Sequence, residues 1–180
     1  VGSGGGWDAA AALRNGASKV VAVEVNPIIN ALVTGEMAEF TGHLFEDPRV
    51  ELHTAEARSF IRRTDQSFDA IIASHTISNA ATASGALSLA ENYVLTTEAF
   101  VDYLQHLKKG GKLWFSRPQA QLPRLVSTIA KALRDLGVKT PAKHVVVFGS
   151  KSPFYGGVIV GRAPLERAFL AEVKGRVPKR

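Results

Sequence analysis

The chain of 180 residues contains no cysteine, and Met37 is its only methionine. The absence of cysteine excludes disulfides, thiolate nucleophiles and cysteine-ligated metal sites. Long hydrophobic runs are also missing, because no stretch approaches the roughly 18 apolar residues that a membrane-spanning helix needs. The five histidines are scattered and show no paired metal-ligand spacing. The remaining composition, 46% hydrophobic and 21% charged, predicts one globular domain over residues 1–180 with a substantial core.

The net charge is +6, and basic residues gather near the end of the chain, at Lys174, Arg176, Lys179 and Arg180. A basic surface of this kind favours nucleic acid, whereas the alternative is a solvated basic tail. No aromatic residues alternate with these cations, as a stacking surface for single strands requires. We therefore do not expect nucleic acid as a partner.

Apolar runs typical of buried strands alternate with segments of helical periodicity. This alternation predicts an α/β fold with a mostly parallel sheet. The expected strands are Lys19–Glu24, Val50–His53, Asp69–Ser74, Lys112–Ser116, His144–Gly149 and Gly157–Gly161. The expected helices are Asp8–Arg14, Pro27–Phe40, Ala55–Arg63, Thr97–Lys108, Leu122–Leu136 and Pro164–Val173. The last two strands are joined by too few residues for a crossover helix, so we expect them to be antiparallel.

A glycine-rich loop, Gly2–Gly6, opens the chain directly before a helical run. Glycine lets the backbone approach a ligand closely, and a helix start offers free N–H groups to it. Glu24 follows about 20 residues later, at a strand end, where a carboxylate can accept hydrogen bonds from ribose hydroxyls. This order indicates a nucleotide site. The alternatives are a simple tight turn for the glycines and a surface acid for Glu24.

Only Val1 precedes this loop, although a loop of this kind ordinarily follows a strand, and there is no initiator methionine. We therefore expect the chain to be part of a longer protein, cut inside or just after its first strand. A lost strand would leave unpaired edge groups on a neighbouring strand, which the rest of the parent or a partner chain would cover.

Several motifs occur in an order that resembles a known family. They are the glycine loop with Asp8, Val23–Pro27, Asp47–Val50, Glu56–Phe60, Phe68–Ile72, Ser84–Tyr93, Thr97–Phe100 and Leu107–Gly111. Together they resemble the spermidine synthase-like (polyamine aminopropyltransferase-like) domains of the class I S-adenosylmethionine-dependent methyltransferase superfamily. The resemblance covers about residues 1–117 and is similar to a bacterial branch in which the domain follows a membrane region. It implies a Rossmann-like sheet of seven strands, the first truncated here and the last antiparallel.

The resemblance implies a binding site for S-adenosylmethionine or its decarboxylated form. In that site Glu24 holds the ribose hydroxyls, and Glu56 and Ala57 lie near the adenine amino group. The implied set also includes Gly2, Gly4, Gly5 and Gly6 beneath the amino-acid part of the cofactor, together with Asp8 and Ser74. Two simpler interpretations stay open: Glu56 as a first-turn acid favoured by the helix dipole, and Asp8 as a cap of the first helix.

The segment after Ser74 departs from the family. Authentic spermidine synthases place an aspartate just after the fourth strand, whereas residues 75–90 contain no acid here. The carboxylates that would bind a polyamine cation and accept its proton are thus missing, which argues against ordinary polyamine synthesis. The candidate catalytic residues are His75 as a base, Glu91 and Tyr93. The alternatives are a loop histidine without catalytic duty and a tyrosine that packs under a lid.

The resemblance implies a cytoplasmic transferase, or the cytoplasmic domain of a membrane protein, that acts on a small-molecule acceptor and can form a homodimer. The acid-free stretch favours a second hypothesis, a catalytically inactive nucleoside-binding sensor or scaffold domain attached to a membrane protein. The glycine loop alone also allows a nicotinamide-dependent oxidoreductase. The expected terminal antiparallel pair and the motifs after residue 47 argue against that third hypothesis.

Overall fold

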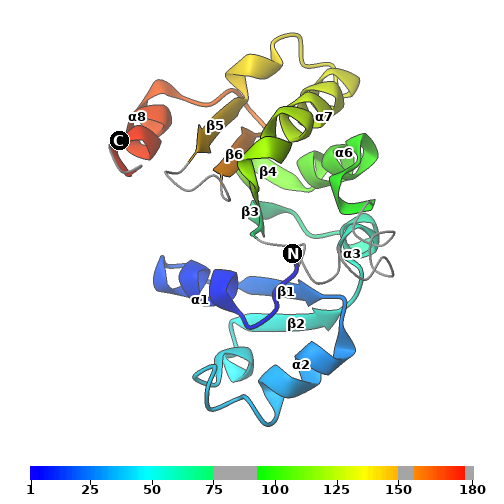
Figure 1. The fold of residues 1–180 in the computed structure, drawn as a ribbon, viewed down its shortest axis with the longest axis vertical. Helices are drawn as coiled ribbons and strands as arrows, with labels where there is room; N and C mark the ends of the chain where they lie inside the picture. The colour runs from blue at the N-terminus through cyan, green and yellow to red at the C-terminus, as the bar shows by residue number, and fades with distance from the viewer. Residues whose placement is uncertain (75–92, 150–155, 177–180) are drawn as a thin grey trace. The chain divides into compact units, whose positions relative to one another are not determined.

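The computed structural model describes residues 1–74, 93–149 and 156–176 (Figure 1). The chain divides into two compact units, Val1–Thr64 and Asp65–Arg180. The single domain expected from the length stays a prediction. His75, Glu91 and most of the Ser84–Tyr93 motif lie outside the described residues.

In the first unit, two parallel strands carry three helices. The strands β1 (Val20–Glu24) and β2 (Val50–Thr54) pair in a continuous register, from Val20 opposite Val50 to Glu24 opposite Thr54. The helices are α1 (Trp7–Arg14), α2 (Pro27–Thr34) and α3 (Ala57–Arg63), with the short 3₁₀ turn η1 (Leu44–Glu46) before β2. The core of this unit consists of small and branched apolar side chains, among them Ala9, Ala22, Val23, Val33 and Ile61. β1 contains three valines, and β-branched residues suit a buried pleated surface, which explains why residues 20–24 form a strand.

The sequence predicts where α2 starts, but its apolar periodicity does not predict where α2 ends. Asn26 is the N-cap and accepts from the Ile28 N–H at 2.9 Å, and Pro27 holds the first helical position. The expected extent to Phe40 is wrong, because the helix stops at Thr34. Gly35 leaves the helical region with φ −119° and ψ −109°.

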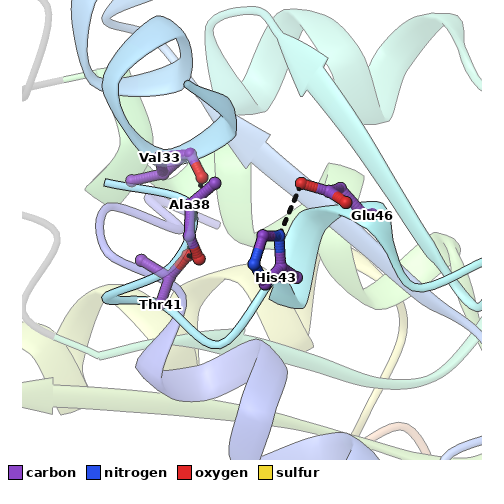
Figure 2. Close-up of polar contacts among 5 residues, drawn as sticks. All are labelled: Val33, Ala38, Thr41, His43 and Glu46. Atoms are coloured by element: carbon purple, nitrogen blue, oxygen red, sulfur yellow. Dashed lines mark hydrogen bonds and ion pairs between the residues drawn. The ribbon is translucent and has the colours of Figure 1, made fainter. Parts of the chain in front are cut away.

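A compact irregular segment then leads to η1. Thr41 Oγ1 donates to the carbonyl oxygen of Ala38 at 3.0 Å, and His43 Nδ1 lies 2.9 Å from Glu46 Oε1 (Figure 2). His43 has a φ of 53°, in the left-handed region that few non-glycine residues occupy. This backbone conformation directs the chain into η1, whose side chains reach the glycine loop.

The second unit contains a four-stranded sheet in the order β3-β4-β6-β5 (Figure 1). The strands are β3 (Phe68–Ala73), β4 (Leu107–Arg117), β5 (Val145–Gly149) and β6 (Gly156–Gly161). β3 is parallel to β4, and β6 is antiparallel to both β4 and β5. The expected antiparallel final pair is therefore confirmed. With the parallel pairs of both units, the α/β, Rossmann-like fold class is confirmed as well.

Helices cover one face of this sheet and complete its core. They are α6 (Thr97–Gln105) and α7 (Leu122–Asp135). A further helix, α8 (Arg167–Arg176), follows β6. The unit also contains three 3₁₀ turns: η2 (Tyr93–Leu95), η3 (Gln119–Gln121) and η4 (Pro141–Lys143). Phe100, Tyr103 and Phe115 are almost fully buried, and their ring centroids lie 5.0–6.0 Å apart. Aromatic rings at this spacing contribute stability beyond their buried area.

One boundary of this unit differs from expectation. The helix expected to reach Lys108 ends at Gln105, and β4 begins at Leu107. The reason is tertiary: Leu107 pairs with Phe68, and the register then shifts before Lys112 pairs with Ala70. Gly110, with a φ of 85°, supplies the left-handed backbone inside the irregular stretch.

No helix in the described parts of the chain is both long enough and apolar enough to cross a membrane. The adjoining membrane region and the cytoplasmic location stay predictions.

Candidate functional site

Glu24 lies at the centre of the candidate site, at the carboxyl end of β1. Its side chain is 7% exposed, and its Oε2 accepts from the Gly4 backbone N–H at 3.1 Å. Its Oε1 accepts from the Asn26 backbone N–H at 2.9 Å. A carboxylate has about four lone-pair sites, so both oxygens keep capacity for a further donor. The acid therefore points to the glycine loop and can still accept hydroxyl donors.

The glycine loop is fixed to the end of β1 by backbone hydrogen bonds. The N–H groups of Gly2 and Ser3 both donate to the Val23 carbonyl, at 2.8 and 3.1 Å, and the Gly6 N–H donates to the Ser3 carbonyl at 2.8 Å. Gly2, Gly4 and Gly6 have φ values of 66°, 47° and 88°. Because side chains disfavour this left-handed region, glycine is favoured at these three positions.

The two sides of the loop differ in how much room they leave. A Cβ on Gly6 would collide with Leu44 Cδ2 and lie 3.0 Å from Phe45 Cζ, so η1 closes that side. A Cβ on Gly4 or Gly5 would meet no atom within 4 Å. Gly5 also lacks a positive φ, so neither backbone strain nor the described protein atoms require glycine there. Open space therefore lies over Gly4 and Gly5, next to the bond to Glu24.

The end of β2 is tied to the same acid. The Ala55 N–H donates to the Glu24 carbonyl oxygen at 3.0 Å, and Thr54 pairs in register with Glu24. Three segments thus converge on Glu24: the glycine loop, the turn into α2 and the end of β2. This convergence at the carboxyl ends of parallel strands is the usual place for ligands in open α/β sheets.

Glu56 is the N-cap of α3. Its Oε1 accepts from the Arg58 N–H at 2.9 Å and its Oε2 from the Ser59 N–H at 2.7 Å. Partial burial raises the pKa of Glu56, but these donors outweigh it and keep that pKa below its ordinary value. Ala57, the first residue of α3, is buried. The Glu56 carboxylate thus caps the start of α3. This role is close to the alternative interpretation of Glu56 as a first-turn acid.

Asp8 lies in the first turn of α1, where its charge complements the positive end of the helix dipole. The N-cap position belongs to Gly6, which makes no side-chain capping bond. Asp8 is therefore within the helix and is not its N-cap.

Two other predicted residues lie in the second unit. Ser74 follows β3, and its Oγ accepts from the Trp114 indole N–H at 3.1 Å. Tyr93 begins η2, and its side chain is 57% exposed. The structure therefore brings Gly2, Gly4–Gly6 and Glu24 together, while Ser74 and Tyr93 belong to the other unit. In residues 1–74, 93–149 and 156–176, no group of three or more histidine or acidic side chains gathers in a way that could hold a metal ion.

Sequence reasoning did not single out Asn26, Thr54 or Asn30, although all three belong to this region. The Asn26-Pro27 pair is an N-cap signal that could have identified the turn into α2. Asn30 and Thr54 touch across 24 residues of sequence, a contact that no local pattern indicates.

The fold is similar to that of known transferases. Spermidine synthase in complex with the transition state analogue AdoDATO matches with 19% identity and a TM-score of 0.63, over 99% of this chain and 57% of that chain. Spermidine synthase from Thermotoga maritima gives the same values. A methyltransferase from Pyrococcus furiosus matches with 18% identity and a TM-score of 0.56, over 90% of this chain and 72% of its own. A protein from Streptococcus mutans in complex with SAH matches with 16% identity and a TM-score of 0.51, over 88% and 83%.

These likenesses show the fold. The chain has the Rossmann-like architecture of the class I methyltransferases and spermidine synthases, and it spans 57% of the length of the spermidine synthase chains that it matches. No protein-family model matches the sequence, and no curated protein does.

Proposed function

We propose that the chain binds S-adenosylmethionine or its decarboxylated form over Gly4, Gly5 and Glu24, as the cofactor-binding part of a transferase. The observation that carries this proposal is the buried Glu24 carboxylate held against the open side of the glycine loop. The ligands named for two similar structures, AdoDATO and SAH, support it.

The chemistry of the residues suits an adenosine-type ligand. Glu24 offers acceptors to ribose hydroxyl donors, and the missing side chains at Gly4 and Gly5 allow close approach. The first turn of α1 adds the positive end of a helix dipole. Asp8, Glu56 and Ala57 stay proposed members of this site, and Ser74 stays a proposed cofactor contact. When bound, the cofactor would supply an electrophilic carbon beside its sulfonium. An acceptor nucleophile would bond to that carbon as the carbon–sulfur bond breaks, the neutral thioether would leave, and the proton of the nucleophile would pass to a base. His75 as that base, Glu91 and Tyr93 are the proposed catalytic residues.

Calorimetric titration of the chain with S-adenosylmethionine, its decarboxylated form and methylthioadenosine tests the proposal. We expect saturable binding of at least one of them. Gly5→Ala should weaken that binding roughly tenfold, because the added methyl occupies ligand space, while the thermal unfolding midpoint stays unchanged.

Gly175→Ala is the matched control. Gly175, in α8, also has open space at its Cβ position and no positive φ, so its substitution should leave binding intact. Failure of the folded chain to bind any of the three ligands would contradict the proposal. Equal affinities of the Gly5→Ala and Gly175→Ala variants would show that the ligand does not lie over Gly5.

A second candidate is a nucleoside-binding sensor or scaffold module without catalysis, attached to a membrane protein. The absence of acids in residues 75–90 of the sequence favours it. Turnover assays with decarboxylated S-adenosylmethionine and polyamine acceptors, read beside the binding data, separate the two candidates. Binding without turnover would support the module, and turnover would exclude it.

A further inference from the structure

Thr54 stands beside Glu24 at the end of the parallel pair. The two residues are direct register partners on β1 and β2, so their side chains leave the same face of the sheet. Neighbouring strands lie about 4.8 Å apart, which places both side chains within reach of one small ligand. Glu24 is buried and accepts hydrogen bonds, whereas Thr54 is exposed and carries a hydroxyl.

The hydroxyl of Thr54 is held by a buried amide. Asn30 Nδ2, from α2, donates to Thr54 Oγ1 at 2.8 Å, and Asn30 is only 7% exposed. Thr54 Oγ1 is thus an acceptor in this bond and keeps its own proton. Among the described residues no group accepts that proton, so the Thr54 O–H is oriented and available for a ligand.

Asn30 is an unfavourable choice for a purely structural residue. Asparagine has a low helix propensity, and Asn30 lies inside α2. Its Oδ1 is buried without a partner among the described residues, which opposes folding. A local conflict of this kind is expected at functional sites, where the fold retains a residue for what it positions.

We propose that Thr54 is a second nucleoside-contacting residue, whose hydroxyl donates to one oxygen of the ribose diol while Glu24 accepts from the other hydroxyl. Asn30 is the positioning residue that orients Thr54. This inference rests on the proposed nucleoside site and adds a specificity to it. A vicinal diol supplies both a donor and an acceptor, so a donor next to an acceptor-only carboxylate selects ribonucleosides over deoxynucleosides.

Calorimetric titration of the Thr54→Val variant with methylthioadenosine and adenosine tests the assignment. Valine keeps the branched shape but lacks the hydroxyl, so we expect binding to weaken roughly three- to tenfold. Thr54→Ser keeps the hydroxyl and should restore most of the affinity. Thr34→Val is the matched control: its hydroxyl donates to the Asn30 carbonyl oxygen inside α2, and removing it should leave affinity unchanged.

Deoxynucleosides remove one hydroxyl from the ligand, just as Thr54→Val removes the hydroxyl from the protein. The penalty of Thr54→Val should disappear for either 2′-deoxyadenosine or 3′-deoxyadenosine, whichever lacks the oxygen that Thr54 contacts. If Thr54→Val weakens the binding of adenosine and both deoxy forms equally, the assignment is overturned. The Asn30–Thr54 hydrogen bond would then serve only to hold α2 against β2. Unchanged affinity in Thr54→Val would overturn it too. If the unmodified chain binds none of these nucleosides, the proposed function itself fails, and this inference fails with it.

Discussion

The Gly4 backbone N–H and the Glu24 Oε2 atom, separated by 20 residues of sequence, are joined by a 3.1 Å hydrogen bond. The other oxygen of the same carboxylate accepts from Asn26, at the turn into α2. One acid therefore fixes two backbone segments and also offers the acceptors of the proposed ligand site. Changes at Glu24 should therefore affect the stability of the first unit and, if the proposed function holds, its ligand binding.

Glu24→Gln should destabilise the protein by about 1–3 kcal/mol. A carboxamide has one oxygen, so either the Gly4 or the Asn26 N–H would face an NH₂ group instead of an acceptor. Chemical denaturation measures the loss. Glu36→Gln makes the same change at an exposed position and should stay within about 0.5 kcal/mol of the parent. Equal stability of the two variants would refute the bridging role of Glu24.

Gly6→Ala should be more damaging than Gly16→Ala. Both glycines have nearly the same left-handed backbone, with φ values of 88° and 89°. A Cβ at Gly6 would strike Leu44 and Phe45, whereas one at Gly16 meets open space. The backbone strain cancels in the comparison, and overpacking adds about 1–3 kcal/mol at Gly6. Thermal unfolding of the two variants measures the difference, and similar midpoints would contradict the packing of η1 against the loop.

The sequence predicted where all six described strands lie, because most of them are short apolar runs with β-branched residues, bounded by turns. It missed the first five residues of β4. It misplaced helix ends where tertiary contacts or a single glycine decide. Apolar Met37 and Phe40 continue the spacing of α2, but Gly35 ends the helix, and these side chains are 40% and 85% exposed. Lys108–Gly111 has the composition of a helix C-terminus, yet the pairing of Leu107 with Phe68 makes it a strand.

The candidate site likewise contains residues that the sequence could predict and residues that it could not. Gly2–Gly6 and Glu24 were predictable because the order of loop, helix, strand and acid reflects a local supersecondary unit. The contact between Asn30 and Thr54 was not, because it depends on where α2 packs against β2. Glu56 shows the limit of spacing arguments: its position suits a ligand contact and an N-cap equally, and the structure uses it as the cap.

The pKa of Asp47 should be about 2 in the folded protein, well below its ordinary 3.8. The Arg49 side chain donates to the Asp47 carboxylate at 3.0 and 2.7 Å, and the Arg49 backbone N–H donates at 2.9 Å. Because the folded pKa is lowered, the stabilisation is complete above about pH 4 and is lost as the pH falls towards 2. Its size is small, since the pair lies at the surface.

An NMR titration of the Asp47 carboxyl group measures this pKa directly. Arg49→Gln removes the side-chain donors but keeps the backbone N–H, so the Asp47 pKa should rise part of the way to its ordinary value. Lys19→Gln, at a cation that pairs with Glu51, serves as the control and should leave Asp47 unchanged. An Asp47 pKa that does not respond to Arg49→Gln would exclude the side-chain bonds as the cause.

Gly157→Ala should change the environment of Trp114 in the second unit. A Cβ at Gly157 would collide with the Phe148 ring, and that ring packs on Trp114 with centroids 4.9 Å apart and an interplanar angle of 34°. Moving Phe148 should shift the Trp114 fluorescence and cost about 1–3 kcal/mol of stability. In a Trp7→Phe background Trp114 is the only tryptophan, so the emission reports on the surroundings of Trp114. Gly175→Ala is the control, because its Cβ would meet no atom within 4 Å. Matching emission and unfolding midpoints for both variants would refute the close packing of Phe148 on β6.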